Sequence, residues 1–252
     1  MENIIIHYLE HPTLEAPVFV QGLPGIGNVG KLAAEHLKDE LKAKKFAEIY
    51  SKFFPPQVLV LDDGLVRIVQ NELYYVKRDN GKDLVVLVGD YQGLTPDGQY
   101  ELADFVLKEL HKLGVRRLFT LGGYGMGRMV QKPRVLGAAT DAALVKEMEG
   151  HGVVFARGEP GAGIVGASGL LLGLGKMYDM QAVCLMGETS GYFVDPKSAQ
   201  AVLEVLTKIL DVKIDFAELE SRAKHIDQIT SKLREVEGVA EERDKQDLGY
   251  IG

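Results

Sequence analysis

The sequence predicts an α/β protein with a three-layer core, in which helices cover both faces of a mixed β-sheet. Short apolar runs, typical of strands that are buried on both faces, alternate along the chain with amphipathic stretches at helical spacing. With 252 residues, 46% of them hydrophobic, the chain can bury one substantial core. We expect a core domain over residues 1–212, an amphipathic helix over residues 213–237 and a C-terminal tail over residues 238–252.

The first strand is expected at Asn3–Tyr8, and the unit that follows organises the rest of the chain. It consists of a buried strand that starts at Val18 and ends at Gly22, a glycine-rich turn and a helix. Asn28 can cap this helix, because its side-chain oxygen can accept a hydrogen bond from a free backbone N–H group. After it, apolar positions recur at helical spacing; they are Val29, Leu32, Ala33, His36 and Leu37.

The remaining elements follow from the same two patterns. Asp62–Gly64 is a turn sequence at the end of a short strand, and we expect a hairpin around Asn71–Glu72. Pro96 and Pro196 each open an amphipathic helix. The other strands are expected at residues 84–90, 117–121, 153–155 and 182–187, and residues 135–140 are expected to be a strand or an extended segment. The other helices are expected at residues 141–148 and 170–177.

The glycine-rich turn matches the dinucleotide-binding pattern G-x-G-x-x-G at Gly25, Gly27 and Gly30. That function needs an acidic residue about 20 positions later, at the end of the next strand, to bind the ribose. Only Glu48 is near, and it lies in the middle of its predicted strand. Pro24 also stiffens the turn. We therefore favour a tight connection that lets the helix pack closely on the sheet, and we expect no cofactor.

Other candidate catalytic groups are incomplete in the sequence. Ser168 lies in a second glycine-rich turn, but its surroundings do not match the nucleophile pattern Gly-x-Ser-x-Gly. Asp90 and Glu188 follow buried strands, at the edge where α/β sheets bind ligands, although acidic residues there commonly form turns and caps. The six histidines are scattered, so we expect no metal site.

Composition excludes several classes of function. The net charge is −7 and the basic residues are dispersed, which disfavours nucleic acid as a partner. Cys184 is the single cysteine, so there is no disulfide framework. No apolar run reaches about 18 residues, and we expect no membrane partner. These features favour a cytoplasmic location.

The C-terminal forty residues differ from the core. Apolar side chains recur at helical spacing from Phe216 to Val236, with charged residues between them. We expect this stripe to mediate formation of a homo-oligomer; the interface residues we select are Ile226, Ile229 and Leu233. The charged segment that follows ends in an apolar tip, which is a candidate docking peptide because solubility alone disfavours such a tip. Its anchors are Leu248, Tyr250 and Ile251.

Several segments, in chain order, resemble the archaeal branch of the proteasome assembly chaperone family. They are Gly22–Gly30, Gly122–Tyr124, Gly166–Leu172 and Leu185–Thr189. The resemblance implies a phosphorylase-like α/β core without enzymatic activity, homo-oligomers or hetero-complexes with a homologue, and proteasomal α subunits or the 20S proteasome as partners.

The resemblance also implies that a C-terminal tail docks into pockets between α subunits. The family's usual tail has tyrosine second from the end, whereas Tyr250 is third from the end here and Ile251 is second. The prediction from sequence is a non-enzymatic chaperone or adaptor for proteasome assembly. The alternative is an enzyme that binds a nucleoside, a nucleotide or phosphate through Gly25, Gly27, Gly30 and Ser168.

Overall fold

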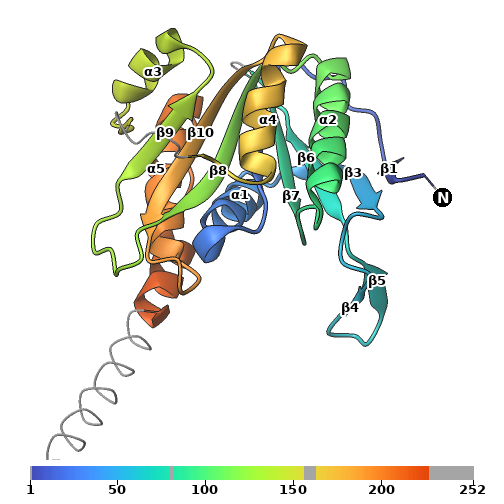
Figure 1. Ribbon diagram of the computed structural model, residues 1–252, viewed down its shortest axis with the longest axis horizontal. Helices are drawn as coiled ribbons and strands as arrows, with labels where there is room; N and C mark the ends of the chain where they lie inside the picture. The colour runs from blue at the N-terminus through green and yellow to red at the C-terminus, as the bar shows by residue number, and fades with distance from the viewer. Residues whose placement is uncertain (1, 80–81, 156–162, 227–252) are drawn as a thin grey trace, which may run out of the picture.

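The computed structural model describes residues 2–79, 82–155 and 163–226 (Figure 1). Eight strands form one mixed sheet in the order β1-β3-β6-β7-β2-β8-β10-β9. The four central strands, β7, β2, β8 and β10, are parallel, and the pairs at both margins are antiparallel. The bounds are β1 Ile4–Tyr8, β2 Val18–Gly22, β3 Lys44–Ser51, β6 Asn71–Val76, β7 Leu84–Gly89, β8 Arg117–Gly125, β9 Val135–Ala139 and β10 Gln181–Thr189.

Helices cover both faces of this sheet, so the predicted three-layer α/β fold is confirmed. One face carries α1 (Val29–Glu40), α3 (Ala142–Glu149) and α5 (Pro196–Leu210). The other carries α2 (Pro96–Lys112) and α4 (Ala167–Gly175), which pack against each other. The described residues also form two 3₁₀ turns, η1 (Ile26–Asn28) and η2 (Lys176–Tyr178).

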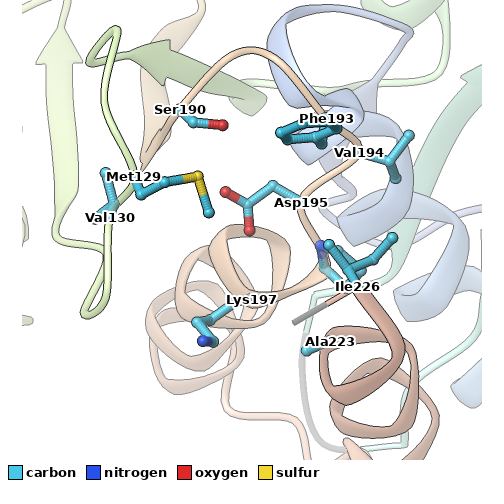
Figure 2. Close-up of a pocket in the computed structure, with 10 residues that line it drawn as sticks. Met129, Val130, Ser190, Phe193, Val194, Asp195, Lys197, Ala223 and Ile226 are labelled. Carbon is cyan, nitrogen blue, oxygen red and sulfur yellow. The ribbon is translucent and has the colours of Figure 1, made fainter. Parts of the chain in front are cut away.

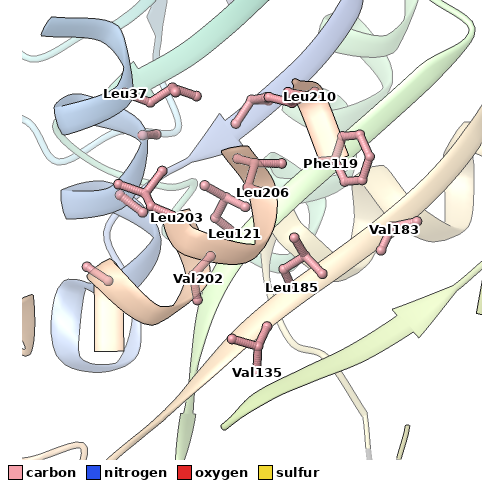
Figure 3. Packing of buried hydrophobic residues seen from close by; sticks show 14 of the residues in the cluster. Leu37, Phe119, Leu121, Val135, Val183, Leu185, Val202, Leu203, Leu206 and Leu210 are labelled. Carbon is pink, nitrogen blue, oxygen red and sulfur yellow. The ribbon is translucent and has the colours of Figure 1, made fainter. Parts of the chain in front are cut away.

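The core beneath α1 and α5 is formed by fully buried aliphatic side chains. Leu203 and Leu206 of α5 lie over Leu121 and Leu185 of the sheet (Figure 3), and all four are almost completely buried. The apolar face that the sequence predicts for α5 is therefore the face that packs on the sheet. Burial of each such side chain stabilises the fold by roughly 2 kcal/mol.

The hairpin predicted around Asn71–Glu72 is wrong. The hairpin instead turns at Asp62–Gly64, where the strands β4 (Val58–Val60) and β5 (Val66–Ile68) pair with each other in a separate two-stranded ribbon. Asn71 begins β6, which pairs with β3 and β7 in the main sheet. The acidic turn followed by glycine is the stronger hairpin signal, because it supplies the backbone conformations that tight turns require.

Two smaller predictions also need correction. Asn28 occupies the N-cap position of α1, but its φ of 50° is left-handed and its side chain makes no capping hydrogen bond. Residues 153–155 do not form a strand; Val154 makes an isolated bridge to Leu136 at the margin of the sheet.

The chain after α5 turns back along the body. Residues 217–226 are helical, and Phe216 and Leu219 pack against the core beneath α5. Ile229, Leu233, Leu248, Tyr250 and Ile251 lie outside the described residues, so the division at residues 212 and 237 stays a prediction. None of the helices in the described part of the chain has the length and apolarity that a membrane crossing requires.

Asp83 is a buried carboxylate that ties β7 to the segments before it. It accepts hydrogen bonds from the backbone N–H groups of Glu15 (2.7 Å) and Arg78 (3.0 Å) and from the Lys77 ammonium (2.8 Å). Burial of the carboxylate acts to raise its pKa, but Lys77 and the two N–H groups outweigh it and hold the pKa below its ordinary value.

We therefore expect Asp83→Asn to lower the free energy of unfolding by about 2 kcal/mol at pH 7. A depressed pKa in the folded state stabilises the protein above the pKa of the unfolded chain, about 3.9, and this stabilisation is lost as pH falls through the folded value. The difference in free energy of unfolding between wild type and variant, measured by urea titration, should therefore narrow from pH 7 to pH 3. Asp62→Asn, in the exposed ribbon turn, is the control. An unchanged gap would contradict this role.

Candidate functional site

The carboxyl ends of the parallel strands lie together at one edge of the sheet, where α/β proteins usually bind ligands. The connections that leave this edge are the turn from β2 to α1, the segment after β7, the loop from β8 to β9 and the loop from β10 to α5. In Figure 1 this edge is the lower end of the molecule. It contains most of the residues that the sequence singles out.

The β2–α1 turn lies so close to the sheet that backbone packs directly against backbone. A Cβ atom added at Gly30 would lie 2.1 Å from the carbonyl oxygen of Leu121, and one at Gly22 would lie 2.1 Å from the carbonyl oxygen of Gly30. Real Cβ atoms do not come so close to backbone atoms. Glycine at these positions therefore allows the first turn of α1 to lie directly against β2 and β8.

The middle of the turn is also occupied by the protein's own atoms. Gly27 has a φ of +60°, and a Cβ there would lie 2.8 Å from the hydroxyl oxygen of Thr189. Its carbonyl oxygen accepts a hydrogen bond from the N–H of Asp195 (2.9 Å). A Cβ at Gly123 would lie 2.3 Å from the carbonyl oxygen of Ile26. The glycines thus join the turn to β8 and to the β10–α5 loop.

Gln92 and Ser168 link the turn to α4 through uncharged groups. The Gln92 amide donates to the carbonyl oxygen of Pro24 (2.6 Å) and accepts from the N–H of Ala167 (2.8 Å). The Ser168 hydroxyl donates to the Gln21 side-chain oxygen (3.1 Å). An amide oxygen is not a general base, so this contact does not activate the serine as a nucleophile.

Asp90 and Glu188, the two acidic residues at strand ends, are each bound by an arginine. Arg67 donates to both carboxylate oxygens of Asp90, at 2.6 and 2.8 Å. Burial acts to raise the pKa of Asp90, but Arg67 and the N–H of Gln70 hold it below the ordinary value.

Arg134 contacts both carboxylate oxygens of Glu188, which is 4% exposed. The hydrogen bond from Arg134 is the main cause that keeps the pKa of Glu188 below its ordinary value. Both carboxylates therefore stay ionised and fix loops, as turn-forming residues do. Within the described residues no group of three or more His, Cys, Asp or Glu side chains could hold a metal ion.

Apolar side chains are exposed beside this packed edge. Figure 2 shows Phe193 and Val194 from the β10–α5 loop, Met129 from the β8–β9 loop and Ile226 from the last described helix around one pocket. Phe193 and Val194 are 44% and 43% exposed. The sequence interpretation missed this loop pair, although three consecutive large apolar residues after a glycine, Tyr192, Phe193 and Val194, are a usable signal.

At this edge the glycine-rich turn packs against neighbouring strands and loops, and exposed apolar side chains lie beside it. Exposed apolar surface of this kind is typical of proteins that contact other proteins. The family comparison agrees with that class. The chain belongs to the PAC2 family, whose pattern it matches over residues 19–234. Solved structures similar to this chain include an archaeal proteasome activator and an archaeal homologue of proteasome-assembly chaperone, so the resemblance drawn from the sequence is confirmed.

Individual relatives match along almost the full chain. Pyrococcus furiosus PbaB, an archaeal proteasome activator, is 43% identical with a TM-score of 0.88, over 93% of this chain and 100% of PbaB. P. furiosus PbaA, an archaeal homologue of proteasome-assembly chaperone, is 27% identical with a TM-score of 0.77, over 99% and 100%. The uncharacterized protein MJ1210 of Methanocaldococcus jannaschii is 41% identical, over 95% of this chain and 93% of MJ1210.

The close approach at Gly30 predicts a large effect of a single methyl group. Gly30→Ala should lower the free energy of unfolding by about 3 kcal/mol, because overpacking against the rigid backbone of Leu121 forces α1 away from the sheet. Gly173→Ala is the matched control: a Cβ on this α4 glycine meets nothing within 4 Å, and alanine should stabilise the helix by up to about 1 kcal/mol. Chemical denaturation measures both. Equal stability of the Gly30 variant and wild type would contradict the packing argument.

Proposed function

We propose that this protein is a non-enzymatic adaptor or assembly chaperone that binds proteasomal α subunits, partly through Leu248, Tyr250 and Ile251. The observation that carries the proposal is the 43% identity to an archaeal proteasome activator along nearly the whole of both chains. Identity at that level over a whole domain supports a shared kind of partner, whereas fold alone would not.

The position of the last described helix supports a docking tail. Ala223 and Ile226 lie beside Phe193 and Val194 at the carboxyl edge (Figure 2), so the chain continues from that end of the body. Tyr250 follows Ile226 by 24 residues, and a segment of that length can reach at most about 80 Å when fully extended. Such a tether allows a tail to reach a pocket while the body stays on the surface of its partner.

Docking of this tail would depend on a few apolar anchor residues and on the presence of several tails in one oligomer. Tyrosine is enriched among the residues that dominate binding energy at interfaces. In the homo-oligomer that we propose, several tails act together, and the effective concentration of the second tail raises the overall affinity without new contacts. Ile226, Ile229 and Leu233 are our proposed subunit contacts. Within one chain, Ile226 already lies against the β10–α5 loop, so a partner would extend that apolar surface.

The alternative is a small-molecule enzyme that uses the glycine-rich turns. The contacts of Gly27 argue against it, because the Thr189 side chain lies beside this glycine and its carbonyl oxygen accepts the N–H of Asp195, so the middle of the turn packs against the protein itself. We expect that millimolar ATP, NAD or phosphate will not raise the midpoint of thermal unfolding, since a ligand of the folded state must raise it. A saturable rise with any of them, confirmed by calorimetry, would favour the alternative.

Removal of Leu248–Gly252 should leave the fold and the mass of the particle unchanged but weaken binding to immobilised 20S proteasome in surface plasmon resonance. Tyr250→Ala should reproduce most of the loss of affinity, about 2 kcal/mol per tail or roughly thirtyfold in the dissociation constant. The reason is that it removes the side chain that we propose fills a pocket between α subunits. Gln246→Ala, in the polar segment just before, is the matched control. Equal binding by truncated and full-length protein would rule out the tail as the contact.

A further inference from the structure

A second pocket lies at the opposite edge of the sheet, where the parallel strands begin; this edge is the upper end in Figure 1. Val18, the first residue of β2, pairs with Arg117, the first of β8, and with Leu84, the first of β7. The end of α5 reaches the same place, because Leu210 and Asp211 also line the pocket. We call this space the amino-edge pocket, and its volume is about 250 Å³.

The inner wall of the amino-edge pocket is apolar. Val18, Phe119 and Leu210 line it, and all three belong to the core cluster beneath α5. Figure 3 shows Phe119 on β8 and Leu210 at the end of α5 in the same part of that cluster. Pockets that hold small molecules are typically lined by such side chains, with a few polar groups that orient the ligand.

The polar groups of the amino-edge pocket are three cations, although the chain as a whole has a net charge of −7. They are Arg78 and Lys82, which lie between β6 and β7, and Arg117 at the start of β8. The sheet topology brings them together, because β7, β2 and β8 are neighbours and their first residues are in register.

Arg78 is held in place by uncharged acceptors. Its guanidinium donates to the carbonyl oxygens of Lys82 (3.3 Å) and Asp211 (3.0 Å). Carbonyl oxygens fix the side chain without neutralising its charge, and a guanidinium has five N–H donors, so donors remain for a further acceptor. The Lys82 ammonium has no hydrogen bond or ion pair with any other described residue.

Arg117 is only partly satisfied by the protein. One of its terminal nitrogens donates to the Glu147 carboxylate at 2.6 Å, and the guanidinium lies 5.3 Å from the centre of the Phe119 ring. Its Nε atom is buried and has no hydrogen-bond partner among the described residues. Glu147 and the pocket residue Asp211 are the carboxylates beside the three cations, so the pocket keeps a positive charge.

We propose that the amino-edge pocket binds a small organic anion. A carboxylate or phosphate head would lie between Arg78 and Lys82, since a guanidinium matches the oxygens of either group. An apolar body would cover Phe119 and Leu210. The volume of 250 Å³ is below the range of about 300–1,000 Å³ for the sites of drug-sized ligands, so the occupant is small.

The proposed ligand differs from the nucleotides and phosphate considered above. ATP and NAD are larger than the pocket, and inorganic phosphate has no apolar body, so the expectation that they leave the unfolding midpoint unchanged also holds for this site. The pocket lies at the edge opposite to Phe193 and Val194. The proposal is therefore independent of binding to the proteasome.

The test is calorimetric titration of the full-length protein with phenylacetate and, separately, with phenyl phosphate. At least one should bind saturably at millimolar concentration, and the tighter of the two identifies the head group. Phenylacetamide has the body of phenylacetate without its charge. It should bind at least about tenfold more weakly than the tighter anion, because the hydrogen bonds from charged donors to an anionic head are lost.

Two variants locate the binding site. Lys82→Glu and Arg78→Gln should each raise the dissociation constant of the tighter anion by about tenfold or more, because each removes a charged donor. Lys82 makes no side-chain contact that the fold needs, so its variant should fold; circular dichroism checks both. Lys132→Glu is the matched control, since Lys132 is an exposed lysine in the β8–β9 loop at the opposite edge.

Three results would overturn the proposal: no saturable binding of either anion, equal binding of phenylacetamide, or wild-type affinity in the folded Lys82→Glu and Arg78→Gln variants. An equal loss of affinity in Lys132→Glu would also overturn it, because the anion would then respond to the overall charge of the protein. Proteasome binding is measured separately, so none of these results bears on the proposed function.

Discussion

The first turn of α1 lies against β2 and β8 at backbone distance, and most of the carboxyl edge depends on this contact. Gly22 and Gly30 make it sterically possible, since any side chain there would collide with a carbonyl oxygen. Once α1 is seated, the carbonyl oxygen of Gly27 can accept the N–H of Asp195. Asp195 in turn caps α5 by accepting the N–H of Ser198. One close approach thereby positions α1 and α5, two of the three helices on that face.

The same contact determines what the edge can do. The middle of the glycine-rich turn packs against the protein itself, because Gly27 lies beside Thr189 and its carbonyl oxygen accepts the N–H of Asp195. The strand-end carboxylates bind Arg67 of β5 and Arg134 of the β8–β9 loop. What the edge and the β4–β5 ribbon still offer to a partner is apolar surface, at Phe193 and Val194 and at the exposed valines of the ribbon, Val58, Val60 and Val66. This distribution supports contacts with proteins and is the physical basis of the proposed adaptor function.

The layers of the fold were predictable because burial on both faces makes strands such as β7 continuous apolar runs. The hairpin is misplaced because Asn71–Glu72 has the polarity of a turn, whereas β6 pairs with β3 on one side and β7 on the other, a tertiary arrangement that no local pattern shows. The packing role of Gly30 was predicted, but its neighbour, the carbonyl oxygen of Leu121, lies 91 residues away in the chain. The exposed pair Phe193 and Val194 was missed because apolarity alone does not distinguish exposed from buried positions.

The most direct measurement of the central claim is an electron cryomicroscopy structure of the full-length protein bound to the 20S proteasome. Our account predicts density for Leu248, Tyr250 and Ile251 in pockets between neighbouring α subunits, with the body of the protein above the α-ring and no ligand at the Gly25–Gly30 turn. A complex in which those pockets are empty and the body alone makes the contact would contradict the account, as would a nucleotide bound at the turn.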